Sequence, residues 1–289
     1  MKVAILQFAP SVGQREDNIQ RAESLIVEAM PANGAPGWDW LILPEMAFSG
    51  YNFHSLEEIT PYLEPTAAGR TTEWARTVAS RLGCHVTIGY PEVNTTDPPK
   101  NYNSTITVSP LGEVLLNYRK THLYYTDETW ASEGPGFYSG TLGTLGAVTH
   151  GICMDINSYR FEAEWSKYEF ASAALAAKSP IVVVSTAFIT HLTTEALAEE
   201  PKLPDDGTLS YWLARMDPIR TATQNDRVTL VFANRCGSEG GTNYAGSSAV
   251  IRIEGGKVSI LDMLGRNEEK LMVVDTDGPP KFAMELRHE

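Results

Sequence analysis

The sequence is short of positive charge. Its 289 residues include 23 Lys and Arg against 36 Asp and Glu, which gives a formal net charge of -13. Proteins that bind nucleic acids neutralise the phosphates with Lys and Arg. The charge balance therefore predicts no nucleic-acid partner, and it favours neutral or cationic substrates.

Cysteine is also scarce, with three residues at Cys84, Cys153 and Cys236. An odd number of cysteines cannot pair fully within one chain, which favours free thiols in a reducing compartment.

The apolar run KVAILQFA at the N-terminus is too short for the core of a signal peptide, and no later run reaches membrane-spanning length. We therefore expect a cytoplasmic protein with no membrane partner. The sequence leaves a monomer and a homo-oligomer equally open.

Motifs for metal and nucleotide chemistry are missing as well. The six histidines are scattered and neither HExxH nor CxxC occurs, so no metal site is expected. No GxSxG motif marks a serine hydrolase, the glycines of GTLGTLG have the wrong spacing for a dinucleotide loop, and no Walker lysine is present. The sequence thus argues against zinc hydrolases, serine hydrolases of that type and nucleotide-dependent enzymes.

Strand and helix patterns alternate along the chain. The segments KVAILQFA, WDWLILPE and CHVTIGYPEV read as strands, and residues 15–30 and 71–82 read as the helices between them. A hairpin follows, then further strands such as IVVVS and VTLVFANR, with the last ones antiparallel. This order predicts an α/β fold of two packed sheets with helices outside. No linker or repeat divides the chain, so we expect a single domain over residues 1–289.

Three expectations concern irregular parts of the second half. Residues 159–178 and 210–227 are each expected to form a helix. The segment TTEALAEEPKLPDDGT, residues 193–208, is expected to be a mobile surface insertion.

Three reactive side chains stand where strands end, which is where α/β sheets place ligand sites. Glu45 follows WLILP, Lys120 follows VLLNYR and Cys153 follows VTHGI. Taken singly, they are more commonly a loop carboxylate, a surface lysine and a buried small hydrophobe. Together they offer a base, a cation that lowers the thiol pKa and stabilises an oxyanion, and a nucleophile. Acyl transfer from an amide needs these three functions.

The segments that carry these residues resemble a known family. LILPEMAFSGY, GEVLLNYRKTHL and GICMDINSYRFEAE are similar, in this order, to the three catalytic segments of the nitrilase, or carbon–nitrogen hydrolase, superfamily. The resemblance implies a four-layer αββα sandwich, a catalytic triad of Glu45, Lys120 and Cys153, and no cofactor. Many members carry a second glutamate eight positions after the lysine, and Glu128 matches it.

A narrower resemblance follows from the residues around the cysteine. Met154, Asp155 and INSYRFEAEW, together with RKTHLYYTDETW, are similar to the fungal protein N-terminal asparagine amidohydrolases. This implies that N-terminal Asn, and Gln as well, of proteins or peptides is converted to Asp or Glu through a cysteine thioester, with release of ammonia, which creates an N-degron. A small-molecule amidase of the ω-amidase or carbamoylase type is the alternative. A non-catalytic binding member is a further one, against which the intact triad argues.

The candidate substrate-binding residues surround the motifs. An ammonium group beside the scissile amide needs an anionic partner, for which Asp155 and Glu128 are the candidates; a structural role is the alternative for Asp155. The backbone N–H of Met154 is expected to help hold the oxyanion. Five aromatic residues either shape the pocket or pack in the core, and Tyr51 and Tyr124 are preferred for the pocket; the set is Phe48, Tyr51, Tyr124, Tyr125 and Trp130. His122 either lines the pocket or makes a structural hydrogen bond. Cys84 is expected in the core, and Cys236 in a loop without a role.

Overall fold

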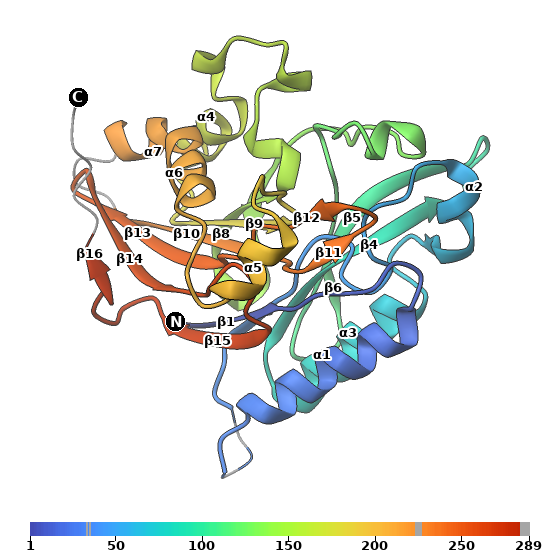
Figure 1. The fold of residues 1–289 in the computed structure, drawn as a ribbon, viewed down its shortest axis with the longest axis horizontal. Coiled ribbons are helices and arrows are strands. Elements are labelled where there is room, and N and C mark those ends of the chain that lie inside the picture. The colour runs from blue at the N-terminus through green and yellow to red at the C-terminus, as the bar shows by residue number, and fades with distance from the viewer. Residues whose placement is uncertain (33, 35, 223–226, 284–289) are drawn as a thin grey trace.

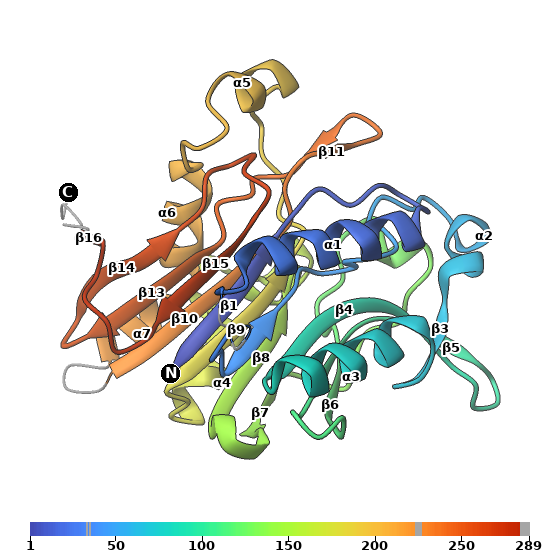
Figure 2. The same ribbon diagram turned by 90° about the horizontal axis from the view of Figure 1, so that it is seen from below.

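Two seven-stranded sheets face each other, and helices cover their outer sides (Figures 1 and 2). The computed structural model describes residues 1–32, 34, 36–222 and 227–283. The first sheet has the order β15-β1-β2-β4-β5-β6, and β3 also pairs with β4. Its strands are β1 (Lys2–Gln7), β2 (Trp40–Ile42), β3 (Glu64–Pro65), β4 (His85–Asn94), β5 (Lys100–Val108), β6 (Val114–Arg119) and β15 (Lys270–Asp275).

The second sheet has the order β16-β14-β13-β10-β9-β8-β7. Its central strands β8, β9 and β10 are parallel, and the others join antiparallel. The strands are β7 (Tyr138–Thr141), β8 (Ala147–Ile152), β9 (Ile181–Thr186), β10 (Arg227–Asn234), β13 (Ala249–Glu254), β14 (Lys257–Met263) and β16 (Phe282–Ala283). A short separate pair is formed by β11 (Ser238–Glu239) and β12 (Thr242–Asn243).

The helices form the two outer layers. The first sheet is covered by α1 (Arg15–Ala29) and α3 (Arg70–Leu82). The second sheet is covered by α4 (Glu169–Ala176), α6 (Asp206–Arg215) and α7 (Asp217–Ala222). Two short helices, α2 (Leu56–Ile59) and α5 (Thr194–Glu199), lie in connections. The arrangement confirms the expected αββα sandwich.

Side-chain alternation along β1 shows why the layers stack. Ala4 and Leu6 point to the helices α1 and α3, whereas Val3 and Ile5 pack against the second sheet. Because successive residues of a strand point to opposite faces, a strand covered on both sides needs an unbroken apolar run. KVAILQ meets this requirement, with every residue after Lys2 buried.

Residues 159–178 do not form the expected continuous helix. Only α4 is α-helical there, because Arg160, Phe161 and Tyr168 have φ values of 54°, 57° and 42°. Non-glycine residues in the left-handed region interrupt a right-handed helix. The segment before α4 therefore runs irregularly over the surface.

Residues 193–227 differ in part from the expectation. The helix expected over 210–227 is two helices, α6 and α7, with Met216 between them; residues 223–226 lie outside the described residues, and Arg227 begins β10. Residues 193–208, expected to be a mobile surface insertion, contain α5, whose Leu197 is buried, and the start of α6, and their mobility stays a prediction.

No helix among the described residues is both long enough and apolar enough to span a membrane.

Candidate active site

Glu45, Lys120 and Cys153 come together between the ends of the two sheets. Glu45 lies just beyond β2, Lys120 directly follows β6, and Cys153 directly follows β8. Glu45 and Lys120 are fully buried, and the side chain of Cys153 is 8% exposed. The structure thus assembles the three residues that the sequence singled out.

Both oxygens of Glu45 are held by hydrogen bonds. Oε1 accepts from Lys120 Nζ at 2.6 Å and from Asn103 Nδ2 at 2.7 Å. Oε2 accepts from the backbone N–H of Ala187 at 2.8 Å. Burial raises the pKa of the Glu45 carboxyl, the charge of Lys120 partly offsets this, and the charge of Asp127 raises it again. A carboxylate in this setting is suited to take and return a proton.

Lys120 has a second buried carboxylate partner, Asp127. Lys120 Nζ donates to Asp127 Oδ2 at 2.5 Å, and Asn103 Nδ2 donates to Asp127 Oδ1 at 3.0 Å. Burial alone would lower the pKa of the Lys120 ammonium, but the charges of Asp127 and Glu45 outweigh it and raise that pKa. Lys120 is therefore a fixed cation, and Asn103 bridges its two acidic partners.

The structure corrects the placement of Glu128. Its side chain is exposed, lies 3.7 Å from the Arg160 guanidinium and does not contact Lys120. The short turn Asp127–Thr129 directs Asp127 inward and its neighbour outward. The buried acid thus lies seven positions after Lys120, not eight.

The backbone turns sharply at Cys153. Its φ of 38° lies in the left-handed region, which non-glycine residues rarely adopt, and the residue begins the one-turn helix Cys153–Ile156. Strain of this kind costs about 1–3 kcal/mol and collects at functional sites. The turn brings Cys153 to the wall of a cavity.

Asp155 fastens this turn to the segment after Lys120. One carboxylate oxygen accepts from the backbone N–H of Ile152 at 2.7 Å and from the Tyr118 hydroxyl at 2.7 Å. The other accepts from the backbone N–H groups of Thr121 and His122 at 2.9 Å and 2.8 Å. Asp155 is fully buried and does not line the cavity, so its expected contact with a substrate ammonium is wrong and the structural alternative holds.

The surroundings of Cys153 favour the protonated thiol. Burial raises its pKa well above the ordinary value, the charge of Glu45 adds to the rise, and Lys120 lowers it only in part. Lys120 lowers the thiol pKa as expected, but burial and the charge of Glu45 outweigh its effect. The thiol needs a base during attack, which Glu45 can provide.

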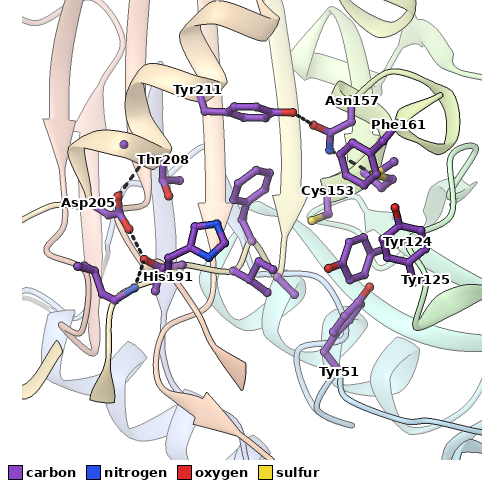
Figure 3. A pocket seen from close by; sticks show the side chains of 17 residues that line it. Tyr51, Tyr124, Tyr125, Cys153, Asn157, Phe161, His191, Asp205, Thr208 and Tyr211 are labelled. Atoms are coloured by element: carbon purple, nitrogen blue, oxygen red, sulfur yellow. Dashed lines mark hydrogen bonds between the residues drawn. The ribbon is translucent and has the colours of Figure 1, made fainter. Parts of the chain in front are cut away.

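A cavity of about 600 Å³ opens at Cys153 (Figure 3). As expected, Tyr51, Tyr124 and Met154 line it. The other described lining residues are Tyr125, Cys153, Asn157, Phe161, Ala187, Phe188, Ile189, Thr190, His191, Leu192, Asp205, Gly207, Thr208 and Tyr211. A large part of the cavity wall comes from the segment between β9 and α6, which begins at Ala187 and ends at Asp205. The sequence carries no catalytic motif there.

The remaining candidates lie elsewhere. Phe48 packs edge-on against Trp74 with ring centroids 4.8 Å apart, and Trp130 is buried in the cluster behind Tyr51. His122 Nδ1 is 3.0 Å from the carbonyl oxygen of Asn157, so the structural alternative holds for it.

Two residues of the site escaped the sequence analysis. Asn103 stands inside β5 as part of an Asn-Ser-Thr triplet, and Asp127 stands beside the more obvious Glu128. A polar residue within an otherwise buried strand was the signal for Asn103. In the described part of the chain, no group of three or more His, Cys, Asp or Glu side chains is arranged to hold a metal ion.

Residues 2–160 match the carbon-nitrogen hydrolase family. The chain belongs to this family. It is 32% identical to a protein N-terminal amidase of Schizosaccharomyces pombe, over 94% of this chain and 98% of that protein. It is 34% identical to a protein N-terminal amidase of Saccharomyces cerevisiae, over 60% of this chain and 41% of that protein.

Solved structures share the fold of this carbon–nitrogen hydrolase. An N-terminal amidase with an Asn-Glu peptide superposes with a TM-score of 0.85 at 22% identity, covering 94% of this chain and 96% of that chain. The N-terminal amidase structure with a Gln-Gly peptide gives the same TM-score of 0.85 at 23% identity and the same coverage of 94% and 96%.

The placement of Asp127 and Glu128 predicts opposite effects for two neighbouring substitutions. Asp127→Asn removes a buried partner of Lys120, so it should cost about 3 kcal/mol of unfolding free energy and lower kcat by about a hundredfold. Glu128→Gln changes an exposed side chain and should alter stability by less than about 0.5 kcal/mol, with kcat unchanged. Urea unfolding and steady-state kinetics measure both. An active Asp127→Asn enzyme beside an inactive Glu128→Gln enzyme would contradict the placement.

The raised thiol pKa predicts the pH dependence of alkylation. The thiolate is the reactive form, so the rate at which iodoacetamide modifies Cys153 should rise from about pH 6 to about pH 9 without a plateau. Burial raises the pKa of Cys84 and of Cys236 to about 12, so neither should react. Peptide mass spectrometry over a pH series provides the measurement. A plateau beginning near neutral pH would show that the resting site holds a thiolate.

Proposed function

We propose that this carbon–nitrogen hydrolase is a protein N-terminal amidase. It converts Asn, and also Gln, at the start of a protein or peptide into Asp or Glu and releases ammonia. The observation that carries the proposal is the cluster of Glu45, Lys120 and Cys153 at the end of a cavity. The S. pombe relative, named a protein N-terminal amidase and aligned over nearly the whole chain, supports the substrate class.

In the proposed first step, Cys153 Sγ attacks the side-chain carboxamide carbon while Glu45 takes the thiol proton. The negative charge that develops on the amide oxygen is stabilised by Lys120 and by the backbone N–H of Met154. An ammonium group has three donors, and two of those of Lys120 go to Glu45 and Asp127 within the described residues. The third donor serves the oxyanion.

The second half of the cycle regenerates the thiol. Glu45 returns its proton to the leaving nitrogen, ammonia departs, and a thioester remains on Cys153. Glu45 then takes a proton from a water molecule, which attacks the thioester carbon. Collapse of this second tetrahedral intermediate breaks the carbon–sulfur bond, and Glu45 returns its proton to Cys153 Sγ. The new side-chain carboxylic acid is released and loses its proton to the solvent.

Several features of the site support an N-terminal residue as the substrate. Tyr125 and Phe161 line the cavity and are 60% and 46% exposed, so they lie at its rim. A terminal residue can enter there while the rest of the chain stays outside.

The three cysteines of the chain are free, in keeping with a reducing compartment such as the cytoplasm. There the new acidic terminus would serve as an N-degron.

Replacing the nucleophile tests the chemistry. Cys153→Ala should abolish ammonia release, because no other group in the site can form the thioester. The variant should keep the far-ultraviolet circular dichroism of the original protein, since a single buried thiol contributes little to the fold. Substantial turnover by the folded variant would overturn the assignment of Cys153.

The substrate class is tested with three peptides: one that starts with Asn, its N-acetylated twin, and one with Asn in second position. Loss of an ammonium partner costs on the order of 3–5 kcal/mol, so the second and third peptides should be at least about a hundredfold poorer in kcat/KM. An ammonia-release assay gives the values. Equal rates on all three would replace the proposal with the small-molecule amidase alternative.

A further inference from the structure

The cavity contains one carboxylate that the proposed chemistry does not use. Among its described lining residues, only Asp205 carries a carboxylate, and none is Lys or Arg. Glu45 is fully buried outside the cavity lining, Asp155 is enclosed by hydrogen-bond donors, and Glu128 pairs with Arg160 at the surface. A cationic group that enters the cavity therefore meets a single fixed anion.

Asp205 is held rigidly at the start of α6. Its Oδ1 accepts from the backbone N–H of Thr208 at 3.0 Å, and its Oδ2 accepts from the Thr190 hydroxyl at 2.6 Å. Its own backbone N–H donates to Ser247 Oγ at 2.8 Å. A carboxylate has about four acceptor positions, so these bonds fix the group and leave capacity for a ligand.

The chain itself limits how far Asp205 is from the catalytic cluster. Ala187 donates its N–H to Glu45, and Thr190, three residues later, donates its hydroxyl to Asp205. The backbone of three residues spans roughly 10 Å at most, and the two hydrogen bonds and the Thr190 side chain add to this distance. Figure 3 shows Asp205 and Cys153 on opposite sides of the cavity, with His191 and Thr208 beside Asp205.

The substrate of the proposed function carries its reacting group and its cation a short distance apart. The carboxamide carbon and the α-nitrogen are separated by three bonds in Asn and by four in Gln. One site can therefore accept either residue, with a small shift of the ammonium along the carboxylate.

We propose that Asp205 binds the α-ammonium group of the substrate and so restricts the enzyme to free N-termini. The inference rests on the proposed function and names the residue that determines its specificity. An acetylated or internal Asn presents no cation, and its binding would leave the Asp205 charge without a partner.

The test compares Asp205→Asn with Asp206→Asn on the Asn-started peptide and on its N-acetylated twin. Asn is as good a helix N-cap as Asp, so Asp205→Asn removes the charge and keeps the start of α6. Asp206 is exposed and does not line the cavity, so its variant makes the same change in net charge one residue away. Melting temperatures of both variants establish that they are folded.

For Asp205→Asn, kcat/KM on the free peptide should fall by roughly thirtyfold or more, mainly through KM. The slow hydrolysis of the acetylated twin, measured at high enzyme concentration, should rise, because the unpaired charge that opposes its binding is gone, so the preference for a free terminus shrinks. Asp206→Asn should behave like the original protein on both peptides.

Two results would overturn the inference, and they can be told apart. If the original protein prefers the free peptide and Asp205→Asn keeps that preference, another group binds the ammonium while the proposed function stands. If the original protein hydrolyses both peptides equally, the proposed function fails, and the role of Asp205 fails with it.

Discussion

The structure depends on one buried cluster of charges, in which Lys120 lies between Glu45 and Asp127. Removing an ion from water costs several kcal/mol unless it finds partners, so these three residues must meet whenever the chain folds. Glu45, Asn103 and Lys120 belong to the first sheet or its loops, whereas Ala187 follows β9 of the second. The cluster therefore fixes the strand ends of both sheets relative to each other.

The same burial explains how the proposed mechanism works without a free thiolate in the resting site. A water-poor site raises the pKa of both Cys153 and Glu45, which keeps the nucleophile protonated and gives its neighbour affinity for the proton. Charge then develops mainly in the transition state, where Lys120 is already in place. Fixed groups that act on developing charge lower the barrier more than groups that bind the ground state equally well.

The positions of the strands and of the catalytic motifs can be predicted from the sequence. Which of two neighbouring acidic side chains faces inward cannot. Apolar runs placed the strands, and the reactive residues at their ends proved to be neighbours in space. The choice between Asp127 and Glu128 could not be made, because a single short turn decides which one faces inward. That turn is set by the bonds of Asp127 to Lys120 and to the backbone N–H of Tyr124, both of which are tertiary contacts.

The position of Asp205 in the cavity could not be predicted from the sequence either, because it lies outside the catalytic motifs. The family match ends at residue 160, and all three residues of the proposed triad lie within it, whereas much of the cavity wall comes from residues 187–211. In the proposed function, chemistry and selectivity are thus carried by separate parts of the chain. Changes in the later part can alter which amide is accepted without disturbing the buried charges, so shared catalytic motifs alone do not define the substrate.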